Sequence, residues 1–428
     1  MSTAVLDTPA ALDTGTALRF VTCGSVDDGK STLIGRLLYE TGHLNADEIA
    51  HVEEASRKRG RKFLDLALLT DGLRAEREQG ITIDVAYRSF DAQGRRIQLG
   101  DAPGHEQYTR NMVTAAAGAD VAILLVDAKN GLTSQTRRHL AICAMLGVED
   151  VIACVNKIDL VDYDEGRFTE LADELIAASE AVDGPRITAI PLSALEGINI
   201  TERSDKLGWY SGPTVLEVLH DLDRLIADEA FRMPVQWVTR HDEGGADVRA
   251  LAGRITSGTV RVGDEVVALP GGKSATVSAI DVLGDARDVA SAPLSVALHL
   301  ATDIDVSRGD VMAPVADQPQ VATRVKATVA WLDENPLSAP ARLEVRQSAR
   351  LVPAIVEELH ERLDLDAMKH EQADALEAND LGIVTLLLAQ PMVVQPYAVN
   401  REMGSMVLVD PGSNRTVGAV MVTEVLGS

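Results

Sequence analysis

Cysteine and positive charge are both scarce in this 428-residue chain, and each shortage excludes a class of protein. The three cysteines, Cys23, Cys143 and Cys154, lie in apolar runs without the spacing of metal ligands. We therefore expect buried, reduced thiols in a reducing compartment rather than a disulfide framework. Only 40 Lys and Arg oppose 65 Asp and Glu, and the formal net charge of −25 disfavours non-specific binding to nucleic acid or anionic lipid. We expect neither as a partner.

Long hydrophobic runs are also missing. No apolar stretch approaches the roughly 18 residues that would suggest a membrane-spanning helix. The N-terminal MSTAVLDTPAALDTGTALRF lacks a basic region followed by an apolar core, so it does not predict a signal peptide, and residues 1–16 are expected to form a flexible tail. The dense basic run RKRGRK at 57–62 is interpreted as a solvated loop or helix face rather than a partner contact. These features predict a cytoplasmic protein without a membrane partner.

The chain does contain enough apolar sequence for several folded domains. Apolar residues make up 46% and charged residues 25%, as in ordinary globular proteins, and the length predicts two or three domains. Over residues 17–228, helical patterns alternate with the strand-like runs LRFVTC, VAYRSF, RIQLGD, VAILLVDA, VIACVNK and ITAIPLSA. This alternation predicts an α/β domain with a mostly parallel sheet, helices on both faces, and ligands at the carboxyl ends of the strands.

Two β-rich segments follow. Residues 232–318 contain short strands separated by glycine-containing turns, which predict a β-barrel, and residues 323–428 predict a third, β-rich domain. Within the third, AIVEELHERLDLDAMKHEQADALEAND at 354–380 has a helical composition, so we expect a helix there. His360 and His370 fall in this segment, and we interpret them as part of a solvated helix face rather than a metal site.

The clearest motif is GSVDDGKS at 24–31, which fits GxxxxGK[ST] between a predicted strand and a predicted helix. Its glycines let the backbone wrap a phosphate, while successive N–H groups and the helix N-terminus supply positive potential. Lys30 is expected to reach the β- and γ-phosphates, and Ser31 to ligate magnesium. The alternative is a chance match in a glycine-rich turn. The residues predicted to bind the nucleotide here are Gly24, Ser25, Val26, Asp27, Asp28, Gly29, Lys30, Ser31 and Thr32.

Two later motifs predict which base is bound. NKID at 156–159 ends a buried strand, and the carboxylate of Asp159 can accept hydrogen bonds from the N1–H and 2-amino groups of guanine, which adenine lacks. SAL at 193–195 ends the next strand and is expected to place a backbone N–H near the guanine O6. Each motif is weak alone, but together and in this order they predict a GTPase. The predicted base-binding residues are Asn156, Lys157, Asp159, Ser193, Ala194 and Leu195.

Between these motifs lies a predicted triphosphate sensor, DAPGH at 101–105. Asp101 is suited to hold magnesium through a water, and Gly104 to bring its backbone N–H to the γ-phosphate. Thr82 in GITID is a candidate magnesium ligand that binds only when the γ-phosphate is present, which would make its segment a switch. The alternative for Thr82 is an ordinary strand threonine. The residues predicted to bind GTP here are Asp101, Ala102, Pro103, Gly104 and His105.

His105 stands where many nucleotide hydrolases place a glutamine. Its imidazole is expected to orient the attacking water, so His105, Lys30 and Gly104 are the candidate catalytic residues. The alternative is a polar residue in the first turn of the following helix.

The motifs GSVDDGKST, GITI, DAPGHEQY and NKID, followed by two β domains, resemble the translation-factor class of GTPases. Longer strings are similar to the GTPase subunit of sulfate adenylyltransferase: DGLRAEREQGITIDVAYRSF, PGHEQYTRNM, QTRRHLAI and GWYSGPTVLEVL. The resemblance implies a P-loop GTPase domain followed by two β-barrels of the elongation factor Tu type, with GTP and Mg2+ as ligands. Residues 335–379 depart from the family's pattern, which leaves the partner surface there open.

The family resemblance also implies a function. A separate small catalytic subunit would join ATP and sulfate into adenosine 5′-phosphosulfate, and this chain, its partner in a heterodimer or a larger assembly, would hydrolyse GTP to drive that reaction. No second P-loop is present, so adenylylsulfate kinase activity is not expected in these 428 residues. Two alternatives stay open: an elongation factor that delivers aminoacyl-tRNA, and a GTP-binding scaffold without turnover.

Overall fold

The computed structural model describes residues 17–58, 64, 66–69, 85–92, 94–105, 108–222, 230–243 and 246–427. The chain divides into two compact units, residues 1–224 and 225–428. Thr82 and the predicted tail over 1–16 lie outside the described residues. Among the described residues, no helix combines the length and apolarity needed to cross a membrane.

The first unit is built on a six-stranded sheet of order β2-β3-β1-β4-β5-β6. β2 pairs antiparallel with β3, and the other neighbours are parallel. Its strands are β1 (Leu18–Gly24), β2 (Ala86–Ala92), β3 (Arg95–Asp101), β4 (Val121–Asp127), β5 (Asp150–Asn156) and β6 (Arg186–Pro191). Its α-helices are α1 (Lys30–Glu40), α2 (Ala46–Lys58), α4 (Thr109–Ala117), α5 (Ser134–Met145), α6 (Glu165–Glu180) and α7 (Val215–Asp221), and its short 3-10 helices are η1 (Leu66–Leu69), η3 (Ile158–Val161) and η4 (Asp205–Leu207).

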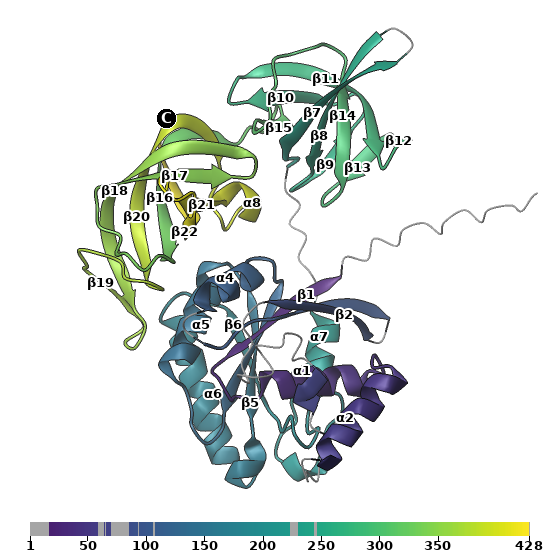
Figure 1. Ribbon diagram of the computed structural model, residues 1–428, viewed down its shortest axis with the longest axis vertical. Coiled ribbons are helices and arrows are strands. Elements are labelled where there is room, and N and C mark those ends of the chain that lie inside the picture. The colour runs from purple at the N-terminus through teal and green to yellow at the C-terminus, as the bar shows by residue number, and fades with distance from the viewer. Residues whose placement is uncertain are drawn as a thin grey trace, which may run out of the picture. The chain divides into compact units, whose positions relative to one another are not determined.

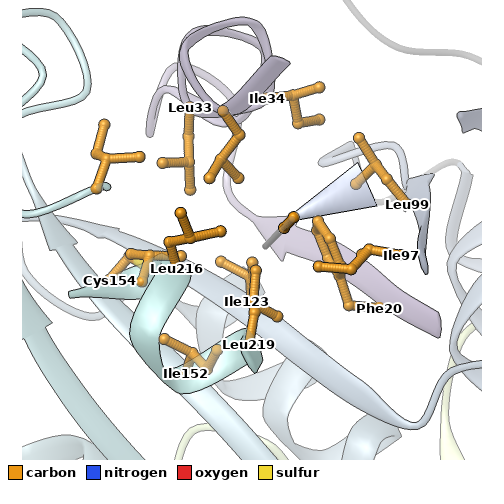
Figure 2. Close-up of a cluster of buried hydrophobic side chains, with 14 of the residues drawn as sticks. Phe20, Leu33, Ile34, Ile97, Leu99, Ile123, Ile152, Cys154, Leu216 and Leu219 are labelled. Carbon is orange, nitrogen blue, oxygen red and sulfur yellow. The ribbon is translucent and has the colours of Figure 1, made fainter. Parts of the chain in front are cut away.

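Burial of both faces explains why the sheet is parallel and central. Every residue of β4 is buried, as expected of a strand in a sheet that is covered on both faces. On one face, Leu33 and Ile34 of α1 and Leu216 of α7 pack against Phe20 and Ile123 (Figure 2). Parallel pairing then brings the carboxyl ends of β1, β3, β4, β5 and β6 to a single edge, where the predicted motifs begin.

The second unit contains two closed β-barrels (Figure 1). In the first barrel, order β10-β15-β7-β8-β14-β11-β12, an additional β10–β11 pairing closes the sheet, and in the second, order β17-β21-β22-β16-β20-β18-β19, a β17–β18 pairing does so. The first barrel and its flanking pair β13-β9 comprise β7 (Met233–Glu243), β8 (Ala246–Arg254), β9 (Thr259–Arg261), β10 (Glu265–Leu269), β11 (Lys273–Val282), β12 (Asp285–Arg287), β13 (Val289–Ser291), β14 (Ser295–Leu300) and β15 (Val311–Pro314). The second comprises β16 (Gln320–Trp331), β17 (Ala341–Gln347), β18 (Arg350–Asp364), β19 (Lys369–Glu371), β20 (Leu381–Val394), β21 (Ser405–Val409), β22 (Thr416–Gly427) and helix α8 (Arg401–Gly404). The predicted fold class, an α/β GTPase domain followed by β-barrels, is confirmed.

The helix expected over residues 354–380 is wrong. Strand β18 runs through the first half of that segment, and β19 follows it. Val352, Ala354 and Val356 are buried while the residues between them are not, which is the period-2 pattern of a strand. Pairing with β17 on one side and β20 on the other overrides the helical composition of the Glu, Leu and His residues.

His360 and His370 are correspondingly strand residues and not part of a helix face. His360 Nε2 lies 2.8 Å from Thr385 Oγ1 on β20, and His370 Nδ1 lies 3.7 Å from the Glu361 carboxylate. Among the described residues, no group of three or more His, Cys, Asp or Glu side chains is arranged to hold a metal ion by itself.

Candidate nucleotide site

The loop between β1 and α1 has the tight backbone that its glycines permit. Gly24, Asp27 and Gly29 have φ angles of +139°, +67° and +96°. At Gly29 a β-carbon would also collide with the side-chain amide of Asn156. The loop therefore requires glycine at this position for two independent reasons, and α1 begins directly after it at Lys30.

Lys30 lies under this loop with only 7% of its surface exposed. Its ammonium group donates hydrogen bonds to the carbonyl oxygens of Gly24 at 2.9 Å and Ser25 at 2.7 Å. Burial lowers the pKa of Lys30, while the nearby Asp101 carboxylate opposes that shift. A β-carbon at Gly104 would collide with the Lys30 ammonium, so the 101–105 segment approaches the loop closely enough to require glycine there.

Asn156 connects the loop to the two base motifs. Its Nδ2 donates to the Asp28 carbonyl oxygen at 2.7 Å, and its Oδ1 accepts from the Ala194 backbone N–H at 2.9 Å. The side chain of Lys157 pairs with Asp127, at the end of β4, at 2.8 Å. One asparagine thus brings together three segments that are far apart in the sequence.

Asp159 carries a buried oxygen that no described residue satisfies. Its Oδ1 has no hydrogen-bond partner among the described residues. A buried, unsatisfied acceptor is costly in a folded protein unless a ligand supplies the donor. The N1–H and 2-amino groups of guanine are donors of the required kind, so this carboxylate fits a guanine nucleotide.

The 101–105 segment begins at Asp101, the last residue of β3. Thr22 Oγ1 donates to Asp101 Oδ1 at 3.0 Å, and the Ala102 N–H donates to the Thr22 carbonyl at 3.3 Å, which holds the start of the segment against β1. The His105 ring makes an edge contact with Tyr108, with 6.0 Å between ring centroids. Tyr108 is the N-cap of α4, and its N–H donates to the His105 carbonyl at 3.0 Å, so His105 lies in the turn that leads into the helix.

The remaining predicted residues lie around the same loop. Asp101, Ala102, Pro103, Gly104, Ser193 and Ala194 are buried, whereas Val26, Asp27 and Leu195 are exposed. Ser31 and Thr32 lie in the first turn of α1 and are partly buried. Every predicted site residue except Thr82 is described, and the structure gathers these residues at the carboxyl edge of the sheet.

Two residues that sequence reasoning did not assign to the site support the loop from α5. His139 is fully buried, and its Nδ1 accepts the Gly24 backbone N–H at 2.9 Å. Burial, followed by the charges of Lys30 and Arg138, lowers the pKa of His139 to about 3, so the ring is neutral and can act as an acceptor. Thr133, which caps α5, makes a 2.6 Å hydroxyl–hydroxyl contact with Ser25. The string QTRRHLAI contained this histidine, but nothing in its spacing pointed to the loop.

Together, the sheet, the glycine-containing loop before α1 and the buried Oδ1 of Asp159 define a P-loop GTPase followed by two β-barrels. Residues 16–228 match the family model for the elongation factor Tu GTP binding domain, and residues 324–423 match that for the GTP-eEF1A C-terminal domain-like family.

Relatives identify the family more narrowly. A sulfate adenylyltransferase subunit 1 from Sulfurovum sp. is 42% identical over 420 residues, which covers 95% of this chain and 87% of that relative. A bifunctional enzyme CysN/CysC from Mycobacterium tuberculosis is 46% identical, covering 95% of this chain and 67% of the relative. The chain belongs to the sulfate adenylyltransferase subunit 1 family of GTPases, as the sequence predicted.

The chain is also similar, more distantly, to solved structures. Sup35 complexed with GDP is 23% identical and superposes with a TM-score of 0.44 over 98% of this chain and 97% of that one. The family assignment rests on the sequence relatives alone.

Proposed function

We propose that this chain hydrolyses GTP as the regulatory subunit of a sulfate adenylyltransferase. Hydrolysis drives the synthesis of adenosine 5′-phosphosulfate from ATP and sulfate, which a separate small catalytic subunit carries out. The name subunit 1 of the relatives supports an assembly with at least one further chain. The observation that carries the GTP assignment is the buried, unsatisfied Asp159 oxygen beside the Asn156 bridge.

The residues around the loop have distinct roles in this proposal. Backbone N–H groups of the loop bind the phosphates, and Lys30 turns from the Gly24 and Ser25 carbonyls to the β- and γ-phosphates. Gly104 brings its N–H to the γ-phosphate, and His105 orients the attacking water by accepting a hydrogen bond. Because phosphoryl transfer needs little proton abstraction, His105 acts mainly by positioning.

Magnesium fits the donor set of this site. The Ser31 hydroxyl and the Asp101 carboxylate, the latter through a water, are hard oxygen ligands of the kind Mg2+ prefers. Thr82 is proposed as the further ligand that binds only in the triphosphate state. When bound, the metal neutralises negative charge that develops on the phosphate oxygens.

The sharpest test of base recognition is Asp159→Asn. The amide can no longer accept hydrogen bonds from both guanine N–H groups, so we expect affinity for GDP to fall by about 10- to 100-fold. An amide N–H can instead donate to the C2 carbonyl of xanthine, so affinity for XDP should rise. Equilibrium titration with both nucleotides measures the change, and unchanged GDP affinity would remove Asp159 from the site.

A translation factor is the competing function within this class. Steady-state GTP turnover separates the two: the small sulfurylase subunit with ATP and sulfate should accelerate it, and ribosomes should not. Acceleration by ribosomes alone would refute the sulfurylase assignment. A scaffold without turnover is tested by Lys30→Ala, which should abolish partner-dependent adenylylation; an unchanged rate would favour the scaffold.

A further inference from the structure

A carboxylate is buried inside the loop that the proposed function wraps around phosphates. Asp28 is only 6% exposed, and its Oδ2 accepts the backbone N–H of Ser25 at 2.6 Å. The same oxygen also faces Gly24: a β-carbon added to Gly24 would lie 3.3 Å from Asp28 Oδ2. A phosphate-binding loop ordinarily offers positive potential, so a negative charge within it opposes the ligand.

The charged groups that face Asp28 leave it incompletely neutralised. They are Lys30 from α1, Lys157 after β5, and Asp127 at the end of β4. Lys30 donates to the Gly24 and Ser25 carbonyls and Lys157 pairs with Asp127, so neither ammonium makes a direct ion pair with Asp28. Burial accordingly raises the pKa of Asp28 to about 6, against the partial opposition of the Ser25 hydrogen bond and the two lysines.

We propose that Asp28 sets how long the product GDP stays bound: its buried negative charge repels the diphosphate and speeds GDP release. This inference rests on the proposed function, because it requires that the loop bind guanine nucleotides. A GTPase that must turn over repeatedly to drive another reaction gains from a loop that does not trap its product.

The proposal has a pH signature with a definite sign. A bound diphosphate stabilises the protonated form of Asp28, so nucleotide binding takes up a proton when the carboxylate is ionised beforehand. Above pH 6 the wild-type chain should therefore lose GDP affinity as pH rises, and near pH 5.5 the repulsion should largely disappear. The phosphates of GDP titrate as well, but their contribution is common to every variant compared.

The experiment compares the full-length wild-type chain with Asp28→Asn, using N-methylanthraniloyl-GDP in stopped-flow dissociation at pH 5.5 to 8.5. Asparagine keeps an oxygen to accept the Ser25 N–H and removes the charge. We expect GDP dissociation at pH 7.5 to slow by about tenfold, a difference that shrinks towards pH 5.5. Asp28→Ala, which removes the charge and the acceptor together, should also release GDP more slowly than the wild type.

Glu40→Gln is the matched control. Glu40 is a partly buried carboxylate in the same unit whose pKa burial also raises, but it bonds Thr201 at the far end of α1. Its GDP dissociation should equal that of the wild type. Equal rates for wild type and Asp28→Asn at every pH, or faster release from Asp28→Asn, would overturn the inference. Failure of the wild type and the control to bind GDP at all would instead refute the proposed function.

Discussion

The six-stranded sheet of the first unit and the second barrel of the second unit show two ways in which sequence specifies a strand. In β4 every residue is buried; the first six are apolar, and the last is Asp127. In β18 buried residues alternate with partly or fully exposed ones from Val352 to Val356, and the partly exposed stretch that follows is rich in Glu and Leu, which also suit helices. A strand buried on both faces is therefore recognisable from its own sequence, whereas a half-exposed strand depends on its neighbours.

The largest expected effect comes from removing one lysine charge in the first unit, compared with removing one in the second barrel. Lys30→Ala should reduce GTP hydrolysis by roughly a hundredfold to a thousandfold, because it removes a buried cation beside the phosphates. Lys369→Ala, the same charge change on exposed β19, should leave turnover unchanged. Partner-stimulated phosphate release measures both, and equal losses would mean that net charge, not the site, sets the rate.

A second contrast concerns histidines. His105→Ala should leave GTP affinity nearly unchanged and lower hydrolysis by at least about tenfold, since the side chain acts on the water and not on the ground state. His370→Ala, on β19 of the second barrel, should change neither. Single-turnover hydrolysis and nucleotide titration separate the two quantities. If His105→Ala lost GTP affinity and hydrolysis to the same extent, His105 would only maintain the shape of the loop.

A third contrast tests β18 itself. Val356→Ala should lower the free energy of unfolding by about 1–3 kcal/mol, because Val356 is fully buried. Glu358→Ala, two residues along but exposed, should change it by less than about 0.5 kcal/mol. Urea unfolding of the full chain measures both, and a smaller effect at Val356 than at Glu358 would contradict the strand register.

The smallest effect is a pH dependence of stability. The pKa of His139 is lowered to about 3 by burial, so as pH falls below about 6.5 the unfolded chain binds a proton that the folded chain does not. The contribution of His139 to the free energy of unfolding is therefore fully present above pH 6.5 and is lost as pH falls. Asp28, with its pKa raised to about 6, has the opposite slope between pH 3.8 and 6.

Comparison of thermal unfolding between the nucleotide-free wild type and His139→Asn from pH 7 to 5 isolates the histidine, because Asp28 is present in both. His139→Asn keeps an acceptor for the Gly24 N–H and should reduce the loss of stability on acidification by up to about 1 kcal/mol per pH unit. His220→Asn, at an exposed position, should retain the wild-type slope. Identical slopes for both variants would mean that His139 does not stay neutral in the folded chain.

The sequence predicted the α/β unit and the composition of its site because the relevant interactions are local. GSVDDGKS, NKID and DAPGH each combine a turn with the functional groups it presents, and each follows a strand. In the third domain a local signal against the helix was available: Pro353 precedes the segment, and Val352, Ala354 and Val356 alternate. Composition outweighed that signal in our prediction.

The family, the order of the domains and the motif residues at the sheet edge therefore follow from local sequence. Only the tertiary structure decided that Asp28 is a buried charge, that His139 accepts the Gly24 N–H, and that residues 350–364 form a strand. The physical reason is the same in each case. Burial, hydrogen-bond partners and strand pairing arise from residues far away in the sequence, 115 positions apart for Gly24 and His139 and 128 for Asp28 and Asn156, and local sequence carries no record of them.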